Sequence, residues 1–321
     1  MTKDSGQHTP DSDEHGAALD SAPGTRLMAG VKVLDFSWSA AAPIATRFLA
    51  DAGGIVVRVE SHAHPDSIRF GGPFRDNVPG INRSGFFADF NASKYSLGLD
   101  MRLPEARRAG LALAGWADVV VESFRPGVMD RWGLSYAAVS ARNPGVVYVS
   151  SCMFGQSGPF AQYPAYGGQG AALTGIHAAT GWPDRLPCGP KGAYTDTIAP
   201  YFTICLIVGA LMARESSGVG QHIDFAQAEG ALQFYGPELA AASVSGDPCL
   251  RDGNRSRRSM PHGAFPCRGE DRWLTLDVAD DGEWAALAST PGAPEWLRDP
   301  CLATVQGRSA RETEVEAAIA G

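Results

Sequence analysis

The 321-residue sequence predicts an α/β protein in which a parallel sheet is covered by helices, followed by a smaller α+β domain. Short Val-rich runs alternate with segments of helical character, which is the order that produces parallel sheets. The Val-rich runs are mainly apolar, as expected of strands that are buried on both faces. The composition, 44% hydrophobic and 19% charged, is that of an ordinary globular protein with enough apolar residues for a large core.

The predicted elements follow one another closely along the first 150 residues. Pro104 suits the first turn of a helix, where its missing N–H is not needed. Ser135 can cap the next helix with its hydroxyl group. The predicted strands are 31–36, 55–60, 119–122, 146–150 and 221–225, and the predicted helices are 42–51, 104–116, the segment between 135 and 143, and 226–234.

The sequence changes character after residue 155. Residues 155–192 are dense in Gly and Pro, which predicts loops and short helices, and an apolar helix follows Asp196. Two short runs on either side of an Arg-Gly-Glu-Asp turn predict a β-hairpin. The predicted domains are a disordered tail at 1–26, a large domain at 27–242, a linker at 243–262 and a small domain at 263–321, which opens with the hairpin strands 263–267 and 272–278.

Charge and residue usage argue against several classes of function. The formal net charge of -8 and the pI near 5.4 disfavour a nucleic-acid binder. Six cysteines form no C-x-x-C pair, so neither a zinc site nor a redox motif is expected. The uncharged run 197–213 is short for a membrane span and contains Pro200, so we interpret it as a helix in a soluble core. We therefore expect a cytoplasmic protein with no secretory signal, metal, nucleic acid or membrane partner.

Two loops after predicted strands are candidate ligand sites. The first, 37–43, consists mostly of small residues and opens a helix, although no G-x-G-x-x-G fingerprint is present. Glu60 ends the second strand, where an acidic residue binds ribose in some α/β folds, but this signal alone is weak and such a residue is more often just a solvated strand end. The second loop, 122–127, carries Arg125, and Arg131 follows nearby. These guanidinium groups suit phosphate, but an ordinary Pro-Gly turn with a surface Arg is an equal alternative.

Asp196 is the candidate nucleophile. It stands at the beginning of the apolar helix, where a carboxylate commonly caps the backbone N–H groups. Capping alone explains the residue, but a capped, partly desolvated carboxylate beside a Gly-rich segment is also suited to covalent catalysis. No G-x-S-x-G or H-E-x-x-H motif is present, so the sequence does not support a serine hydrolase or a zinc protease.

In combination, these segments resemble the family III CoA-transferases, which include formyl-CoA transferase, crotonobetainyl-CoA transferase and the α-methylacyl-CoA racemases. The resemblance covers about residues 29–300, and its motifs occur in the order of the family. The matching stretches are GVKVLDF at 30–36, ATRFLADAG at 45–53, VRVE at 57–60, NASKYSLGLD at 91–100, ADVVVESFRPGVMDRWGL at 117–134, NP at 143–144, FGQSGP at 154–159 and SGVGQHID at 217–224.

The resemblance implies a Rossmann-like large domain, an interlocked dimer and transfer of CoA between carboxylic acids through an aspartyl-CoA thioester. Asp196 matches the catalytic Asp of the family. Coenzyme A or acyl-CoA is then a substrate, a small carboxylic acid is the second substrate, and no permanently bound cofactor is expected. The CoA-contacting residues that the resemblance implies are Ser39, Ala40, Leu99, Arg102, Ser123, Phe124, Arg125, Arg131, Ala165 and Tyr166.

Departures from the family pattern define the alternatives. Tyr166 stands where the racemases have His, which disfavours racemase activity. Ser61 stands where some members have a phosphate-binding Arg. Members of the family continue beyond the small domain, so we expect a C-terminally truncated chain with an incomplete small domain. The alternatives are a catalytically weak subunit of a heteromeric CoA-transferase, whose partner is a related subunit rather than a second copy, and a dehydrogenase, which the missing glycine fingerprint disfavours.

Overall fold

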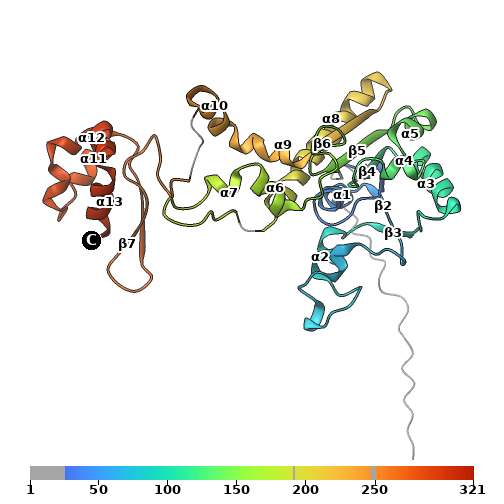
Figure 1. Ribbon diagram of the computed structural model, residues 1–321, viewed down its shortest axis with the longest axis horizontal. Helices are drawn as coiled ribbons and strands as arrows, with labels where there is room; N and C mark the ends of the chain where they lie inside the picture. The colour runs from blue at the N-terminus through green and yellow to red at the C-terminus, as the bar shows by residue number, and fades with distance from the viewer. Residues whose placement is uncertain (1–25, 191, 247–250) are drawn as a thin grey trace, which may run out of the picture. The chain divides into compact units, whose positions relative to one another are not determined.

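A computed structural model describes residues 26–190, 192–246 and 251–321 (Figure 1). The predicted disordered tail lies outside the described residues except for Arg26, and part of the predicted linker, 247–250, does so as well. The core element is a six-stranded sheet in which every pair of neighbouring strands is parallel. The strand order is β3-β2-β1-β4-β5-β6, which is the doubly wound order of Rossmann folds. The strands are β1 Lys32–Asp35, β2 Ile55–Glu60, β3 Tyr95–Gly98, β4 Val119–Glu122, β5 Val147–Cys152 and β6 Gln221–Ala226.

Helices cover both faces of this sheet because its central strands are apolar on both sides. The four residues of β4 are all buried. One core includes residues of α3, α4 and α5 against the sheet, and the other includes residues of α1 and α8. The helices of this part are α1 Ala41–Asp51, α2 Gly85–Phe90, α3 Pro104–Trp116, α4 Val128–Arg131, α5 Tyr136–Arg142 and α8 Tyr194–Ser217, with short 3-10 helices at η1 Ser67–Phe70 and η2 Arg75–Asn77.

Helix α8 differs from its prediction in two respects. It begins at Tyr194, so Asp196 lies inside the first turn and not at the cap. It is also only partly buried: Ile207 packs in the core, whereas Tyr201 and Met212 are exposed. In the described part of the chain, α8 is the one helix with the length and apolar composition of a membrane span. Its contact with the sheet identifies it as a covering helix of the α/β fold.

The C-terminal residues form a small core of their own around a predicted hairpin. Strands β7 His262–Pro266 and β8 Trp273–Asp277 pair antiparallel, as predicted. Arg308 is completely buried and donates to the carbonyl oxygen atoms of Met260 and Leu302 at 2.7 and 3.1 Å. The last residues form two helices, α12 Val305–Ala310 and α13 Glu312–Ala320, and Val315 of the second is buried in this core with Trp284 and Leu297.

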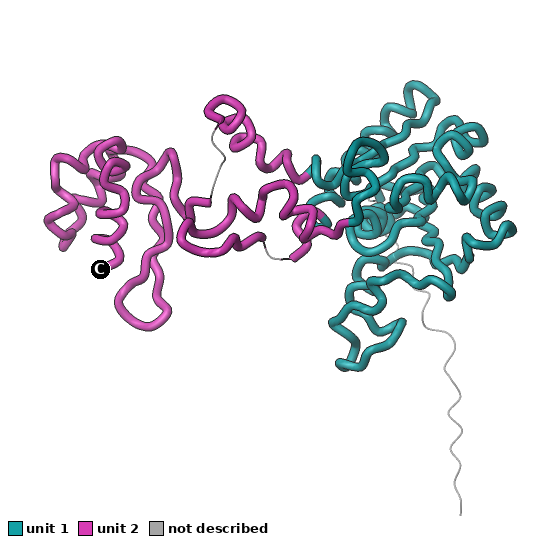
Figure 2. The backbone as a smooth tube through the Cα atoms, in the orientation of Figure 1, with its two compact units in different colours: residues 1–164, 196–230 teal, residues 165–195, 231–321 magenta. Residues whose placement is uncertain are grey.

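The chain divides into two compact units (Figure 2). The first comprises residues 1–164 and 196–230 and holds the parallel sheet. The second comprises residues 165–195 and 231–321 and holds the hairpin. The domain boundaries given by the sequence stay predictions. The remaining elements are α6 Gly167–Leu173, α7 Ile176–Ala179, α9 Gln227–Leu232, η3 Gln233–Tyr235, α10 Gly236–Ser245, α11 Asp281–Ala288, η4 Glu295–Arg298 and η5 Pro300–Leu302.

Candidate active site

The loop after β1 and the turn after β4 meet at the carboxyl edge of the sheet. The strand order reverses between β1 and β4, and this reversal is where doubly wound folds bind ligands. The backbone N–H of Trp38 donates to the Ser123 hydroxyl at 2.9 Å, so the two segments are joined directly. The sequence placed candidate sites in both segments, and the structure brings them together.

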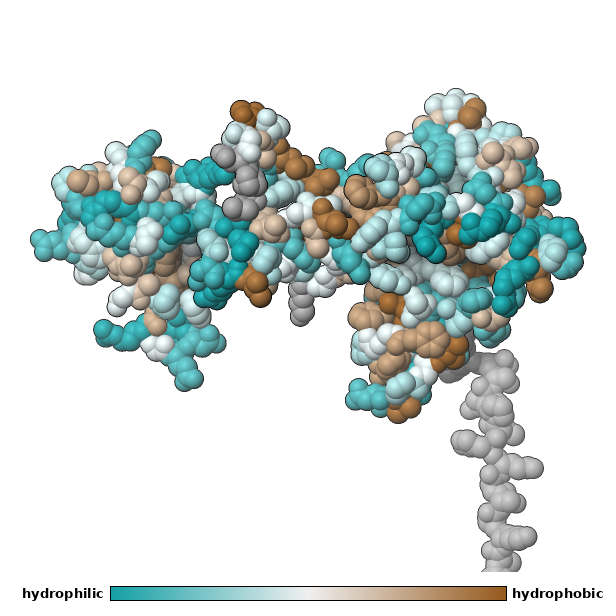
Figure 3. Space-filling model, viewed as in Figure 1, coloured by the Kyte–Doolittle hydropathy of each residue, from teal (hydrophilic) through white to brown (hydrophobic). Residues whose placement is uncertain are grey.

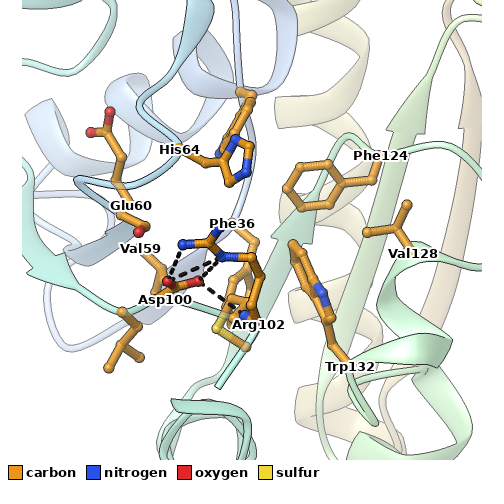
Figure 4. Close-up of a pocket in the computed structure, with 13 residues that line it drawn as sticks. Phe36, Val59, Glu60, His64, Asp100, Arg102, Phe124, Val128 and Trp132 are labelled. Carbon is orange, nitrogen blue, oxygen red and sulfur yellow. Dashed lines mark hydrogen bonds and ion pairs between the residues drawn. The ribbon is translucent and has the colours of Figure 1, made fainter. Parts of the chain in front are cut away.

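An aromatic cavity opens at this edge, within the first unit (Figure 4). The Phe124 ring packs edge-to-face between Trp38, with ring centroids 5.8 Å apart, and Trp132, at 5.1 Å. Such rings offer a flat apolar surface to a ring system of similar size. The lining residues are Phe36, Trp38, Val59, Glu60, Ser61, His64, Leu99, Asp100, Met101, Arg102, Phe124, Val128 and Trp132.

Charged side chains around the cavity are mostly paired with one another. Arg102 donates through Nε and Nη2 to the Asp100 carboxylate, at 2.9 and 2.6 Å (Figure 4). These hydrogen bonds lower the pKa of Asp100 to about 2. Glu60 binds Arg69 through both carboxylate oxygen atoms, at 2.7 and 2.8 Å. Burial alone would raise the pKa of Glu60, but the hydrogen bonds from Arg69 and the Asp66 backbone hold it below its usual value. Glu60 therefore has a structural role in this ion pair.

A buried carboxylate holds the first loop in a strained conformation. Ser39 has a φ of 66°, which is uncommon for a residue with a side chain. Its backbone N–H donates to both oxygen atoms of the fully buried Asp66 at 3.1 Å. Arg58 pairs with the same carboxylate at 2.7 Å. This local strain, fixed by a buried ion pair, is typical of a loop whose backbone must present a given geometry.

A second buried ion pair lies directly below the loop. The Lys94 ammonium group is 3.0 Å from the Asp35 carboxylate, and both side chains are almost fully buried. Asp35 also accepts hydrogen bonds from Ser37 and from Thr46 of α1. Burial raises the pKa of Asp35, but Lys94 and Arg58 more than offset this, so the pKa lies below its usual value. The pair thus connects the end of β1 to the beginning of α1.

The turn after β4 is held by Glu122, the last residue of that strand. Its carboxyl oxygen Oε2 accepts the Phe124 N–H at 2.7 Å. Gln156 donates to the Phe124 carbonyl oxygen at 3.3 Å and to Oε1 of Glu122 at 3.4 Å. Burial raises the pKa of Glu122 to about 7, against a lowering by hydrogen bonds from Ser150 and the Phe124 backbone. The carboxyl group next to the cavity is therefore half protonated near neutral pH.

Replacing Glu122 by Gln is expected to change how stability depends on pH. The folded chain keeps the Glu122 proton up to about pH 7, whereas the unfolded chain loses it near pH 4.5. Between these values the folded state binds more protons, so the contribution of Glu122 to stability is present below pH 4.5 and is lost as the pH rises through 7. The loss amounts to about 3 kcal/mol. Urea unfolding at pH 5, 6, 7 and 8 measures the free energy of unfolding of wild type and of Glu122→Gln. The difference between the two should shift in favour of Glu122→Gln as the pH rises. A difference that stays constant with pH would contradict the raised pKa of Glu122.

The predicted site residues divide between the cavity and other places. Leu99, Arg102 and Phe124 line the cavity, Ser123 anchors its turn, and Ser39 and Ala40 belong to the loop that carries Trp38. Arg125 and Arg131 do not line it. Both are exposed, and their side chains make no hydrogen bond or ion pair with the described residues. Ala165 and Tyr166 belong to the second unit, and Asp196 belongs to the first.

Sequence reasoning did not identify several residues that shape this site. Trp38 and Trp132 supply two of the three aromatic rings. Trp38 lies in the candidate loop 37–43 and Trp132 in the motif 117–134, but neither was assigned a role. Asp66 and Lys94 are buried charges, and the only signal in the sequence is that ionisable residues occur close to apolar segments. Among the described residues, no group of three or more His, Cys, Asp and Glu side chains is arranged to hold a metal ion.

The fold and this cavity define a doubly wound α/β protein with a candidate ligand site at the reversal of strand order. The sequence matches the model of CoA-transferase family III over residues 28–321. It is 35% identical to acetyl-CoA:oxalate CoA-transferase of Acetobacter aceti, over 90% of this chain and 73% of the relative. The beta subunit of succinyl-CoA–L-malate CoA-transferase of Chloroflexus aurantiacus is 29% identical, over 92% and 73% of the two chains.

A solved structure gives the same result for the fold. A CaiB/BaiF family protein from Brucella suis has a TM-score of 0.81 and 30% identity to this chain, and the match covers 92% of this chain and 78% of that one. The chain therefore belongs to CoA-transferase family III, and it is a CoA-transferase. The resemblance that the sequence motifs indicated is confirmed, as is the Rossmann-like parallel sheet.

Proposed function

We propose that this chain transfers coenzyme A from an acyl-CoA donor to a small carboxylic acid through an aspartyl-CoA thioester on Asp196. The observation that carries the proposal is the place of Asp196, in the first turn of α8 within a chain that belongs to this family. The positive end of a helix stabilises a negatively charged group in its first turn. The names of the relatives support the substrate class: acetyl-CoA and oxalate for one, succinyl-CoA and L-malate for the other.

The proposed reaction proceeds by acyl exchange at the Asp196 carboxyl group. The carboxylate attacks the donor thioester and expels the CoA thiolate, which gives a mixed anhydride. The thiolate then attacks the aspartyl carbonyl carbon, releasing the donor acid and leaving the aspartyl-CoA thioester. The acceptor carboxylate attacks this thioester, and the released thiolate attacks the acceptor carbonyl carbon, which yields the new acyl-CoA and free Asp196. Each step exchanges one acyl bond for another, so the thioester energy is conserved as long as water is excluded.

The aromatic cavity is the proposed place for the nucleotide end of CoA. Its three aromatic rings, packed edge-to-face, suit the adenine base, since a flat aromatic base gains from contact with ring edges and faces. Arg102 already carries a carboxylate partner, whereas Arg125 and Arg131 have none among the described residues. The two unpaired guanidinium groups follow Phe124 closely in the chain, so they are the proposed partners of the CoA phosphates.

Replacing Arg125 or Arg131 by Ala is expected to weaken CoA binding about tenfold to a hundredfold, because each loses a charge-assisted hydrogen bond of about 1.5–3 kcal/mol. The dissociation constant can be measured by calorimetry at one fixed salt concentration. Arg108→Ala is the matched control, since Arg108 is an exposed Arg that pairs with Glu105 on α3. Equal CoA affinity in all three variants would show that the phosphates bind elsewhere.

The test of the function itself is a substrate screen on the purified chain. Acetyl-CoA, succinyl-CoA and aromatic acyl-CoA donors are combined with oxalate, L-malate and other small acids, and mass spectrometry detects the new acyl-CoA. Transfer with at least one pair, together with a CoA adduct on the peptide that contains Asp196, supports the proposal. Transfer with an adduct on another residue would refute the role of Asp196.

A second candidate function is that of one subunit in a heteromeric CoA-transferase. The relative from Chloroflexus aurantiacus is named as a beta subunit, and this observation favours the alternative. In that case the purified chain binds CoA but transfers it only after a related subunit is added. Racemase activity is disfavoured, because Tyr166 cannot readily perform the proton transfer of an imidazole.

A partner subunit, identical or related, also explains apolar surface on the first unit. Apolar side chains gather over the segment around α2 (Figure 3), and Phe70, Val78, Ile81 and Phe86 are all exposed there. On α8, the exposed Tyr201 contacts the half-exposed Phe48 ring. Patches of this kind mark subunit contacts. We propose a dimer in the cytoplasm, and sedimentation of a monomer at micromolar concentration would contradict it.

A further inference from the structure

A row of hydrogen-bonding side chains crosses three strands directly behind the Phe124 turn. The register pairs Glu122 of β4 with Ser150 of β5, and Ser150 with Asp224 of β6. Because paired residues of neighbouring strands share one face, the three side chains lie on the same side of the sheet. Ser150 and Glu122 are each only 2% exposed. The row therefore connects the buried residues Glu122 and Ser150 to the exposed residue Asp224 at the edge strand β6.

His222 extends this row on the same face. Its Nε2 atom lies 3.1 Å from the Ser150 hydroxyl, and its ring stacks on Tyr136 with centroids 5.0 Å apart. Partial burial lowers the pKa of His222, which favours the neutral ring. A neutral imidazole either donates or accepts at Nε2, depending on its tautomer. The Ser150 hydroxyl can therefore donate to Glu122 while accepting from His222, or donate to His222 while accepting from Glu122.

Residues of the row hold the backbone N–H of Phe124 directly and its carbonyl oxygen through Gln156. Glu122 accepts the Phe124 N–H at 2.7 Å, and Gln156 donates to the Phe124 carbonyl oxygen at 3.3 Å. Gln156 is itself fixed, because its backbone N–H donates to both carboxylate oxygen atoms of Asp224 at 2.9 and 3.0 Å. The ring held in this way is the central one of the aromatic cavity.

We propose that Glu122 is a positioning residue for CoA: its carboxyl group, held by Ser150 and Gln156, sets the Phe124 turn and so fixes the ring against which the nucleotide binds. The inference rests on the proposed function, in which CoA occupies the aromatic cavity. Glu122 itself does not touch the ligand in this arrangement. Its effect on affinity is transmitted through the backbone of Phe124.

Both protonation states of Glu122 preserve the hydrogen bond to Phe124. When ionised, Glu122 accepts from Ser150, which accepts in turn from His222. When protonated, Glu122 donates to Ser150, and Ser150 donates to His222. The other titratable or charged groups facing Glu122 are Asp224 of β6, Asp130 of α4, and Tyr148 and Cys152 of β5, with Arg125 in the lining of the adjacent cavity. The two acidic groups favour the protonated state of Glu122.

The test compares two substitutions of Glu122 by CoA affinity. Glu122→Leu removes the acceptor while keeping most of the volume, and we expect about tenfold weaker CoA binding, the effect of one lost buried hydrogen bond. Glu122→Gln keeps an acceptor for Phe124 and a donor for Ser150, so it should bind CoA within about twofold of wild type. Val149→Ala is the control, because it destabilises the same sheet from the opposite face and should leave CoA affinity unchanged.

A second measurement needs no ligand. In protein labelled with [15N]Phe, the Phe124 amide resonance, assigned with Phe124→Leu, is followed between pH 5 and 9. We expect a shift with a midpoint near pH 7 in wild type and in His222→Phe, and no such shift in Glu122→Gln. In Glu122→Leu the resonance should move to the position of an amide without this bond at every pH.

The outcomes separate the inference from the proposed function. If wild type binds CoA and Glu122→Leu binds it equally well, or if Val149→Ala weakens binding as much as Glu122→Leu, Glu122 has no positioning role. If the Phe124 resonance responds as expected but wild type does not bind CoA, the proposed function fails while the control of the turn by Glu122 stands. An unchanged Phe124 resonance in Glu122→Leu overturns the inference whatever CoA does.

Discussion

Replacing Asp196 by Ala is expected to lower the rate of CoA transfer by about a thousandfold or more, because the reaction then has no carboxylate to carry the acyl group and CoA. The rate of new acyl-CoA formation is measured with the best donor–acceptor pair from the screen. Asp196→Asn should show the same loss, since an amide is a poor nucleophile, and it keeps the size of the side chain.

Two controls separate a chemical role of Asp196 from a structural one. Glu215→Gln changes an exposed carboxylate in the last turn of the same helix and should leave the rate unchanged. CoA affinity of Asp196→Ala should also remain close to wild type, because the aromatic cavity is formed by other elements. An Asp196→Asn variant with full turnover would show that another group carries the acyl transfer.

The sequence predicted the sheet well because its strands are buried on both faces. A short Val-rich run has few stable arrangements other than a buried strand. Strands β2 and β4 accordingly have the predicted bounds. Strand β3, Tyr95–Gly98, was not predicted as a strand. It forms the edge of the sheet and is largely exposed, so its sequence carries no buried apolar pattern. The start of α8 was misplaced by three residues: the conspicuous cap former Asp196 predicted a helix from residue 197, whereas the helix begins at Tyr194.

The candidate site was predictable only where it depends on local sequence. The loop at 37–43 and the turn at 122–127 follow strands, so the carboxyl edge of the sheet had to bring them close. The groups that hold them are distant in sequence: Asp66 reaches Ser39 across 27 residues, and Lys94 reaches Asp35 across 59. No rule based on sequence spacing predicts that residues so far apart will pair. Their burial, which decides their energy, appears only once the chain is folded.

Replacing Lys94 by Met is expected to destabilise the chain by about 3–5 kcal/mol, because the buried Asp35 carboxylate then loses the cation that pairs with it directly. Lys94 also donates to the Pro43 carbonyl oxygen and to Asn91, at 2.9 Å each, so three interactions are lost together. Urea unfolding at pH 7 measures the change in the free energy of unfolding. Arg47→Met is the matched control, since Arg47 pairs with Asp51 on the exposed side of α1 and should contribute at most about 1 kcal/mol.

The pH dependence of the Lys94→Met effect identifies its cause. In wild type the pKa of Asp35 lies below its ordinary value of 3.8, so the ion pair contributes stability above that pH and loses it as the pH falls. Without Lys94, burial raises the pKa of Asp35, and the buried acid becomes neutral at mildly acidic pH. The destabilisation should therefore be largest at pH 7 and should shrink toward pH 4. The double variant Asp35→Asn/Lys94→Met should be more stable than Lys94→Met alone, since no charge remains buried at this position. A penalty that is the same at pH 4 and pH 7, and that Asp35→Asn does not relieve, would mean that Lys94 acts through packing and not through its charge.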